Sequence, residues 1–226
     1  MKGNNKKKVG ILRAGGFARE TLWIFREANE EKNAWEVLGF IDDNKENYGK
    51  IICDLPILGG FEWLYKNNNN DLYVINAIGS PKTKKKIMEK TSGKNIKFCS
   101  VIHPTVRMSK YIEIGKGTII TAGNILTTQI KIGSHVILNL DCTVGHDSII
   151  ENYCTIAPGV HISGNVHLEK GVDLGTGAVI IQGITIGAWS IIGAGSAVIS
   201  DIPSNVTAVG IPAKVIKTHS NLNNSI

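Results

Sequence analysis

Aliphatic residues recur at every sixth position through the second half of the chain. The series runs through seventeen hexads from residue 102 to residue 198 without an insertion. Its members are Ile102, Met108, Ile114, Ile120, Leu126, Ile132, Leu138, Val144, Ile150, Ile156, Ile162, Leu168, Leu174, Ile180, Ile186, Ile192 and Val198. An amphipathic helix would need apolar residues three and four positions apart, which this spacing does not supply. The pattern therefore predicts repeated β-structure.

A second column of mostly small or β-branched residues lies four positions after the first. It comprises Val106, Ile112, Thr118, Asn124, Ile130, Val136, Cys142, Ser148, Cys154, Val160, Val166, Val172, Ala178, Ile184, Ser190, Ser196 and Ile202. Glycine recurs directly after the aliphatic position, at Gly115, Gly133, Gly145, Gly175, Gly187 and Gly193. Short strands joined by sharp corners fit this period. Three strands would close a triangular coil, and successive coils would stack about 4.8 Å apart.

Strands and helices alternate in the first hundred residues. Apolar segments at 9–12, 37–41 and 71–78 predict three strands, and the lysine-rich segment 81–90 predicts a helix. This alternation is typical of a small parallel α/β sheet of Rossmann-like type. We therefore expect two domains, an α/β domain over residues 1–100 and a β-prism over residues 101–226.

A glycine turn after the first predicted strand matches the fingerprint G-x-G-x-x-G/A in part, with Arg13 at its first glycine. Turn amides at a helix N-terminus bind phosphate, and an acidic residue after the next strand can meet a base or ribose. The candidate nucleotide-binding residues are Arg13, Gly15, Gly16, Asp42, Asp43 and Gly79. The alternative is that these residues only permit a turn and end a strand. A redox dinucleotide is disfavoured because the fingerprint is incomplete.

Charge and composition narrow the classes of partner. The net charge of +6 resides partly in Lys82 and the run 84–86, which we expect to be solvated, with some near an anionic small molecule. Aromatic residues make up only 6% of the chain, too few for a stacking surface, so no nucleic-acid partner is expected. No apolar run has membrane-spanning length, and the four cysteines form no CxxC pair. These features favour a reduced, cytoplasmic protein without a membrane partner.

The six histidines do not converge as ligands of one metal would. His146 has Thr128 and Gly164 at the positions one coil before and after it, so we expect no metal. His146 is instead a candidate general base. The adjacent carboxylate of Asp147 can orient its ring, and the backbone amide of Gly164 can meet a developing oxyanion.

Several motifs together resemble the hexapeptide-repeat sugar acetyltransferases of the sialic-acid and bacillosamine type, which act on nucleotide-linked 4-amino-4,6-dideoxyhexoses. They are "GFIDDN", "IHP", "GHD", "IAPG", "SGNV" and "GIPAK". The resemblance implies a left-handed parallel β-helix, a homotrimer with active sites between neighbouring prisms, and acetyl-CoA as cosubstrate. It also implies direct attack by the C4 amine of a nucleotide-activated sugar, in bacterial surface glycan biosynthesis.

Site residues follow from the resemblance position by position. It implies His146 as base, Asp147 as its acidic neighbour, Asn139 as a further catalytic-site residue and Gly164 as backbone donor to the acetyl carbonyl. The expected coenzyme-binding residues are Gly164, Thr155, Gly210, Pro212 and Lys214. Two positions depart from the pattern: Thr155 stands where some relatives carry a second histidine, and Arg13 stands where relatives usually carry glycine.

Two alternatives remain at this point. One is O-acetylation of a sialic-type sugar, in which the same base would deprotonate a hydroxyl. The other is a non-catalytic scaffold, which would need neither the His146–Asp147 pair nor the "GIPAK" tail. The hexads do not encode the identity of the sugar or the choice among UDP, dTDP and GDP.

Overall fold

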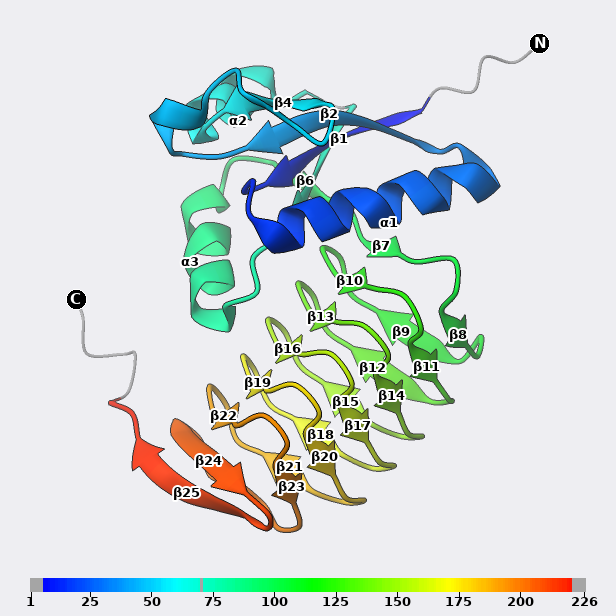
Figure 1. Ribbon diagram of the computed structural model, residues 1–226, viewed down its shortest axis with the longest axis vertical. Coiled ribbons are helices and arrows are strands. Elements are labelled where there is room, and N and C mark those ends of the chain that lie inside the picture. The colour runs from blue at the N-terminus through cyan, green and yellow to red at the C-terminus, as the bar shows by residue number, and fades with distance from the viewer. Residues whose placement is uncertain (1–5, 70, 221–226) are drawn as a thin grey trace.

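The computed structural model describes residues 6–69 and 71–220, which form a sheet domain above a long prism (Figure 1). The sheet has the order β3-β4-β2-β1-β5-β6 and is parallel except for the β3–β4 pair. Its elements are β1 (Lys7–Leu12), α1 (Gly16–Lys32), β2 (Trp35–Ile41), a 3-10 turn (Lys45–Asn47), β3 (Ile51–Ile52), β4 (Leu55–Gly59), α2 (Phe61–Asn67), β5 (Leu72–Asn76), α3 (Pro81–Thr91) and β6 (Lys97–Phe98).

The α/β prediction is confirmed by β1, β2, β5 and α3, which cover the segments expected to be strands and helix. The hairpin β3–β4 and helix α2 were not predicted. Pro56 interrupts the apolar pattern of β4, and proline weakens a strand signal. None of the helices in the described residues is long and apolar enough to span a membrane.

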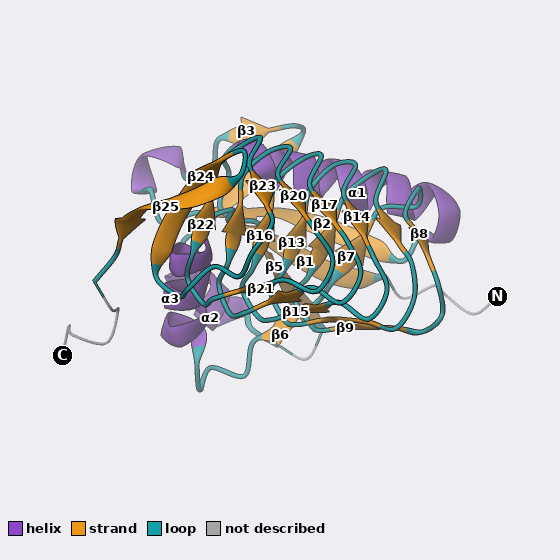
Figure 2. Cartoon of the chain, turned by 90° about the horizontal axis from the view of Figure 1, so that it is seen from below, coloured by secondary structure: helices purple, strands orange, loops and turns teal. Residues whose placement is uncertain are grey.

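The prism is a left-handed parallel β-helix built from seventeen strands of two or three residues, seen as three rows in Figure 2. The first face holds β7 (Val101–Ile102), β10 (Ile119–Ile120), β13 (Ile137–Leu138), β16 (Thr155–Ile156), β19 (Asp173–Leu174) and β22 (Ile191–Ile192). The second face holds β8 (Arg107–Met108), β11 (Ile125–Leu126), β14 (Thr143–Val144), β17 (His161–Ile162), β20 (Val179–Ile180) and β23 (Ala197–Val198). The third face holds β9 (Ile112–Ile114), β12 (Ile130–Ile132), β15 (Ile149–Ile150), β18 (His167–Leu168) and β21 (Thr185–Ile186).

Both predicted columns line the prism core. Each of the seventeen strands ends on a residue of the aliphatic column, and this column is buried from Ile120 onward. The second column is buried from Thr118 onward. Met108 is exposed because it lies in the first coil, where no earlier coil covers it. The hexad register is therefore confirmed along the prism.

The repeated glycines have a different role from the one that the period suggested. A Cβ at Gly145 would lie 2.5 Å from the backbone nitrogen of Gly164 in the next coil, and one at Gly115 would lie 2.5 Å from Ser134 N. These glycines allow the coils to stack closely. The left-handed backbone conformation occurs two residues later, for example at Asp147 with φ 60°.

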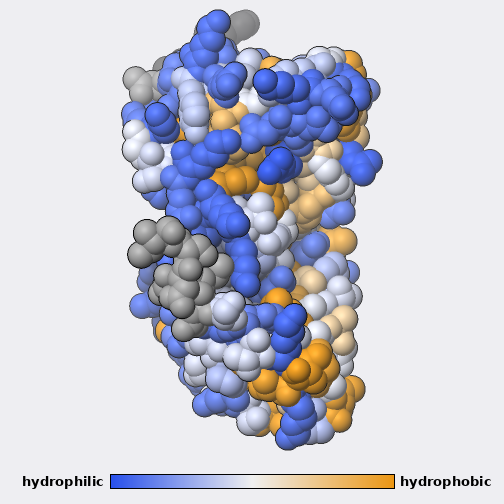
Figure 3. All heavy atoms as spheres, turned by 90° about the vertical axis from the view of Figure 1, so that its left-hand side faces the viewer, coloured by the Kyte–Doolittle hydropathy of each residue, from blue (hydrophilic) through white to orange (hydrophobic). Residues whose placement is uncertain are grey.

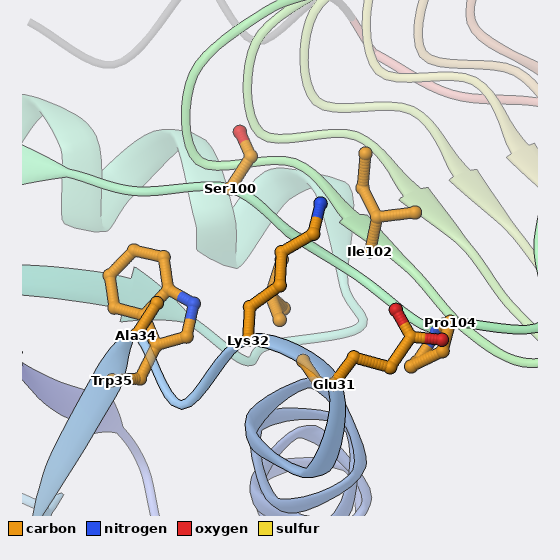
Figure 4. Close-up of a pocket in the computed structure, with 9 residues that line it drawn as sticks. Glu31, Lys32, Ala34, Trp35, Ser100, Ile102 and Pro104 are labelled. Atoms are coloured by element: carbon orange, nitrogen blue, oxygen red, sulfur yellow. The ribbon is translucent and has the colours of Figure 1, made fainter.

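The sheet domain rests on the first face of the prism. Val101, Ile119 and Ile137 point outward from that face and join Phe25 of α1 in one buried cluster. A cavity of about 160 Å³ lies where α1 ends, with Lys32 between Ser100 and Ile102 (Figure 4). The two predicted domains thus share a core.

A C-terminal hairpin extends the first face. It consists of β24 (Val206–Gly210), which pairs in parallel with β22, and β25 (Ala213–Thr218), which pairs antiparallel with β24. Hydrophobic side chains gather at the lower end of the surface shown in Figure 3. In the hairpin, Ile211 and Ile216 are 80% and 64% exposed.

Candidate active site

The corner between β14 and β15 displays His146 and Asp147 to solvent. Val144 before the pair and Ser148 after it are buried, while the side chains of His146 and Asp147 are 49% and 52% exposed. The Asp147 N–H donates to Thr128 O of the preceding coil, and His146 O accepts from Asn165 N of the following coil. The corner is therefore held on both sides by the backbone ladder.

Asp147 sets the orientation of the His146 ring. Its Oδ2 lies 2.7 Å from His146 Nδ1. An ionised carboxylate only accepts hydrogen bonds, so a neutral His146 carries its proton on Nδ1 and presents an unprotonated Nε2. A histidine in this state can accept a proton from a substrate.

Gly164 covers the other end of the ring. Its position is so close that a Cβ would lie 2.5 Å from His146 Nε2. The Gly164 N–H donates to no acceptor in the described residues, whereas the equivalent amides of Lys170 and Ala188 at another corner donate to glutamate oxygens. An open backbone donor thus stands beside the basic nitrogen.

Most of the predicted nucleotide-binding residues lie at the carboxyl ends of three adjacent strands. Gly15 follows β1, Asp42 follows β2 and Gly79 follows β5, and β1 lies between the other two. Parallel α/β sheets bind ligands in the crevice at this edge. Gly15 and Gly16 begin α1, so its first amides face the same region.

Asp42 and Arg13 meet in that crevice. Asp42 Oδ2 accepts from Ala14 N at 3.2 Å, and Asp42 Oδ1 lies 3.8 Å from Arg13 Nη1. Arg13 has φ 76°, a conformation that suits glycine.

Asp43 contacts two helices of the sheet domain. Its Oδ1 accepts from Phe61 N at 3.0 Å, at the start of α2, and its Oδ2 lies 3.2 Å from Lys90 Nζ. Both oxygens are thus engaged within the chain. A nucleotide contact by Asp43 stays a prediction.

Asn139 and the tail lie away from His146. Asn139 occupies the corner between the first and second faces, where its Oδ1 accepts from Leu140 N. Gly193, at this same corner, lies under Val209, so the turn of Gly210 and Pro212 belongs to this side too. His146 and Gly164 lie at the corner between the second and third faces. Within one chain, Asn139 and the turn of Gly210 and Pro212 therefore lie at a different corner from His146.

Lys84 was expected to be solvated, and that expectation is wrong. Its side chain is completely buried, and Nζ donates to Cys154 O at 2.9 Å and to Thr155 Oγ1 at 2.8 Å. Burial lowers the pKa of Lys84 to about 7, with smaller opposing contributions from Cys154 and Asp173. The surrounding lysine run carries no sequence signal that singles out Lys84.

Thr155 lies at the domain boundary. Besides accepting from Lys84, its hydroxyl donates to Gly79 O in the crevice. Both hydrogen-bonding roles of the hydroxyl are thus occupied between domains. A coenzyme contact by Thr155 stays a prediction.

Burial shifts the pKa values of two cysteines and one histidine. Cys142 and Cys154 are buried, as predicted, and burial raises the pKa of these thiols to about 11 and about 12. His135 is buried too, which lowers its pKa to about 4. Among residues 6–69 and 71–220, no three His, Cys, Asp or Glu residues are grouped so that they could hold a metal ion.

Comparison with known proteins places this chain in a family. Residues 8–91 match the PglD N-terminal domain family. The chain is 31% identical over 151 residues to the GDP-perosamine N-acetyltransferase of Escherichia coli O157:H7, an alignment that covers 66% of this chain and 67% of that protein. The chain belongs to the hexapeptide-repeat N-acetyltransferases of nucleotide-linked amino sugars. The predicted acetyltransferase family is thus confirmed.

Two solved structures share the whole architecture. PerB from Caulobacter crescentus, in complex with CoA and GDP-perosamine, has a TM-score of 0.85 and 28% identity, covering 93% of this chain and 97% of that one. The acetyltransferase domain of PglB from Neisseria gonorrhoeae, in complex with acetyl coenzyme A, has a TM-score of 0.85 and 25% identity, covering 93% and 100%. Both the sheet domain and the prism are therefore shared.

Proposed function

We propose that this chain transfers acetyl from acetyl-CoA to the C4 amine of a nucleotide-linked 4-amino-4,6-dideoxy sugar. The observation that carries the proposal is His146, oriented by Asp147, with Nε2 beside the open amide of Gly164. One relative is named a GDP-perosamine N-acetyltransferase, and the structure of PerB contains CoA and GDP-perosamine. Both observations support the same substrate classes for this chain, and they support N-acetylation over O-acetylation.

The mechanism needs no enzyme nucleophile. The sugar amine attacks the thioester carbonyl, and His146 Nε2 takes its proton as the new amide bond forms. The Gly164 N–H stabilises the oxyanion of the tetrahedral intermediate, which then collapses with loss of the coenzyme thiolate. Asp147 holds the ring and favours the imidazolium that forms.

Binding roles follow from position. Gly15, Gly16 and Arg13 would contact the nucleotide phosphates at the start of α1, while Asp42 and Asp43 would contact the base or ribose. Gly79 borders the same crevice. Gly210, Pro212 and Lys214, with Asn139 at the same corner and Thr155, would contact the coenzyme or the reacting groups.

A homotrimer would complete this site. The sheet domain and its crevice dock on the first face of the prism, and His146 lies at the corner opposite that face. A sugar held in one protomer's crevice would therefore be acetylated by a neighbour's His146. Ile125, Val179, Ile181 and Ile199 lie on the second face or just after it and are 40–53% exposed, which supports burial against another prism.

A cytoplasmic location and a role in bacterial surface glycan biosynthesis fit the substrates. Acetyl-CoA and nucleotide sugars are cytoplasmic metabolites, and the four cysteines are free. The acetylated sugar would then be consumed by a glycosyl transfer that releases the nucleotide.

Thiol release from acetyl-CoA tests the proposal. The acceptor panel contains GDP-, UDP- and dTDP-linked 4-amino-4,6-dideoxy sugars, with a free sialic acid as the O-acetyl acceptor. We expect release with an amino-sugar nucleotide and a product heavier by one acetyl group. Release only with sialic acid, or with no acceptor, would contradict the proposed N-acetylation.

A further inference from the structure

The outward row of the first face is the surface on which the sheet domain docks. Its first three residues, Val101, Ile119 and Ile137, are aliphatic and lie under α1. Thr155 comes next, one coil further along, and lies under α3. Because the coils repeat about every 4.8 Å, aliphatic contact by itself specifies the height of the domain on the prism only loosely.

Lys84 donates its side-chain hydrogen bonds to this row at one coil, and it also interacts electrostatically with the Asp173 carboxylate of the next coil. Its Nζ donates to Thr155 Oγ1 and to Cys154 O, and the Thr155 hydroxyl donates onward to Gly79 O. The residues in register with Thr155 are Ile137 and Asp173. An isoleucine side chain can neither accept from a lysine nor donate to a carbonyl. An ionised aspartate can accept from a lysine but cannot donate to a carbonyl.

Gly79 and Lys84 bracket the first turn of α3. Gly79 precedes the N-cap Ser80, and the Lys84 N–H donates to Ser80 O within the helix. A single prism side chain thus holds both the loop that leaves β5 and the helix that follows it. This loop borders the crevice in which the nucleotide sugar is proposed to bind.

We propose that Lys84 is a positioning residue that, through Thr155, fixes the nucleotide-binding loop around Gly79 at one height on the prism. The role rests on the proposed function, since that height decides where the sugar amine meets a neighbouring His146. Complete burial of a lysine is unfavourable unless its donors are satisfied, and a hydrophobic residue would pack here at a lower cost. A single buried polar pair that selects one register among equivalent ones is a known use of such groups.

Hydrogen exchange tests the positioning without any substrate. Thr155→Val removes the hydroxyl and keeps the shape, Thr155→Ser restores the hydroxyl, and Lys84→Met removes the donor. We expect faster exchange in segment 77–84 for Thr155→Val and Lys84→Met, and protection close to that of the original protein for Thr155→Ser. Lys86→Met, at an exposed position of the same helix, is the matched control. Unchanged protection in Thr155→Val would overturn the proposal, even if Lys84→Met fails to fold.

Steady-state kinetics then test the functional consequence. Because a misplacement of about 1 Å can cost about 10²-fold in rate, we expect kcat/KM for the nucleotide sugar to fall about 10- to 100-fold in Thr155→Val and in Lys84→Met. In Lys84→Met the KM for acetyl-CoA should stay within about twofold, and the double variant should lose no more than either single one. Additive losses, or an equal rise in both KM values, would contradict positioning. If the original protein acetylates no nucleotide sugar, the proposed function fails while the exchange result still stands.

Discussion

A side chain at Gly164 would collide with the ring of His146, because its Cβ would lie 2.5 Å from Nε2. Gly164→Ala should therefore displace the imidazole while leaving the coil intact. Since a shift of about 1 Å can cost about 10²-fold, we expect a loss of roughly that size in kcat. The measurement is steady-state acetyl transfer combined with thermal unfolding.

Gly93→Ala is the control for that variant. Gly93 lies between α3 and β6, has φ +73°, and a Cβ at this position would meet no heavy atom within 4 Å. Alanine there should therefore cost about 1–2 kcal/mol of backbone strain without touching the site. We expect lower stability and nearly unchanged kcat. Equal losses of activity in both variants would mean that Gly164 acts only through stability.

Removal of the base should affect the chemical step. His146→Ala is expected to lower kcat by about 10² to 10⁴ without unfolding the exposed corner. Asp147→Asn should also lower kcat, because an amide can donate to Nδ1 and thereby favour the tautomer with its proton on Nε2. Near-normal turnover by His146→Ala would exclude its role as the base.

Asp42 and Asp43 should respond differently to substitution. Asp42→Asn weakens the acceptor for Ala14 N and Arg13 in the crevice, so we expect a higher KM for the nucleotide sugar. Asp43→Ala removes the acceptor at the start of α2 as well as the proposed contact to the base or ribose, so we expect a loss of about 1 kcal/mol in unfolding free energy besides a higher KM. Chemical unfolding and KM measurements on both variants separate the two roles.

Mixed trimers test the shared site. Gly15→Glu places a carboxylate in the open space of the crevice, where the phosphates are proposed to bind, and His146→Ala removes the base. Neither variant should be active alone. Co-expression in equal amounts should restore about a quarter of the original activity, since each site takes its crevice and its base from different protomers. If purified mixed trimers recover no activity, the crevice and the base of each site belong to the same chain.

Stability should rise with pH just above neutrality because of Lys84. The pKa of Lys84 is lowered to about 7 in the folded chain against 10.5 in the unfolded one, so the unfolded state binds more protons between these values. The unfolding free energy should therefore increase by up to about 1.4 kcal/mol per pH unit. Below pH 7 Lys84 is protonated in both the folded and the unfolded chain, so the free-energy cost of burying its charge is fully present.

Chemical unfolding of the original protein and of Lys84→Met between about pH 7 and 8.5 measures this slope. We expect the slope to be smaller in the variant. Three titratable groups interact electrostatically with Lys84, namely Asp173, Cys154 and His135. The pKa of Asp173 is raised by its burial. The pKa of Cys154 is raised to about 12 and that of His135 lowered to about 4, so their effects fall outside the chosen window.

The hexads could be predicted because one column of side chains decides the core. Spacing alone located Val144 inside and His146 at a corner, and the structure agrees. The crevice residues could be placed as well, because Gly15, Asp42 and Gly79 each follow a recognisable strand.

Contacts between the two domains could not be predicted. Lys84 sits in a run of lysines, and only the docking of α3 buries it. Asp43 likewise acquires one of its partners, Phe61 N, from α2, an element that the apolar pattern did not indicate. Both depend on tertiary packing, which local spacing does not record.

Because the coils stack at a constant spacing, the distance between two points on one face of the prism is set by the number of coils between them. Gly164 lies one coil beyond His146, and two further coils separate β17 from β23, so separations along one face are whole numbers of steps of about 4.8 Å. Insertion of eighteen residues would lengthen the spacing by one step and leave every corner unchanged. Deletion of one residue would shift the aliphatic column out of the core register in every later coil. The number of coils therefore sets the distance between His146 and the C-terminal hairpin, where the coenzyme is proposed to bind.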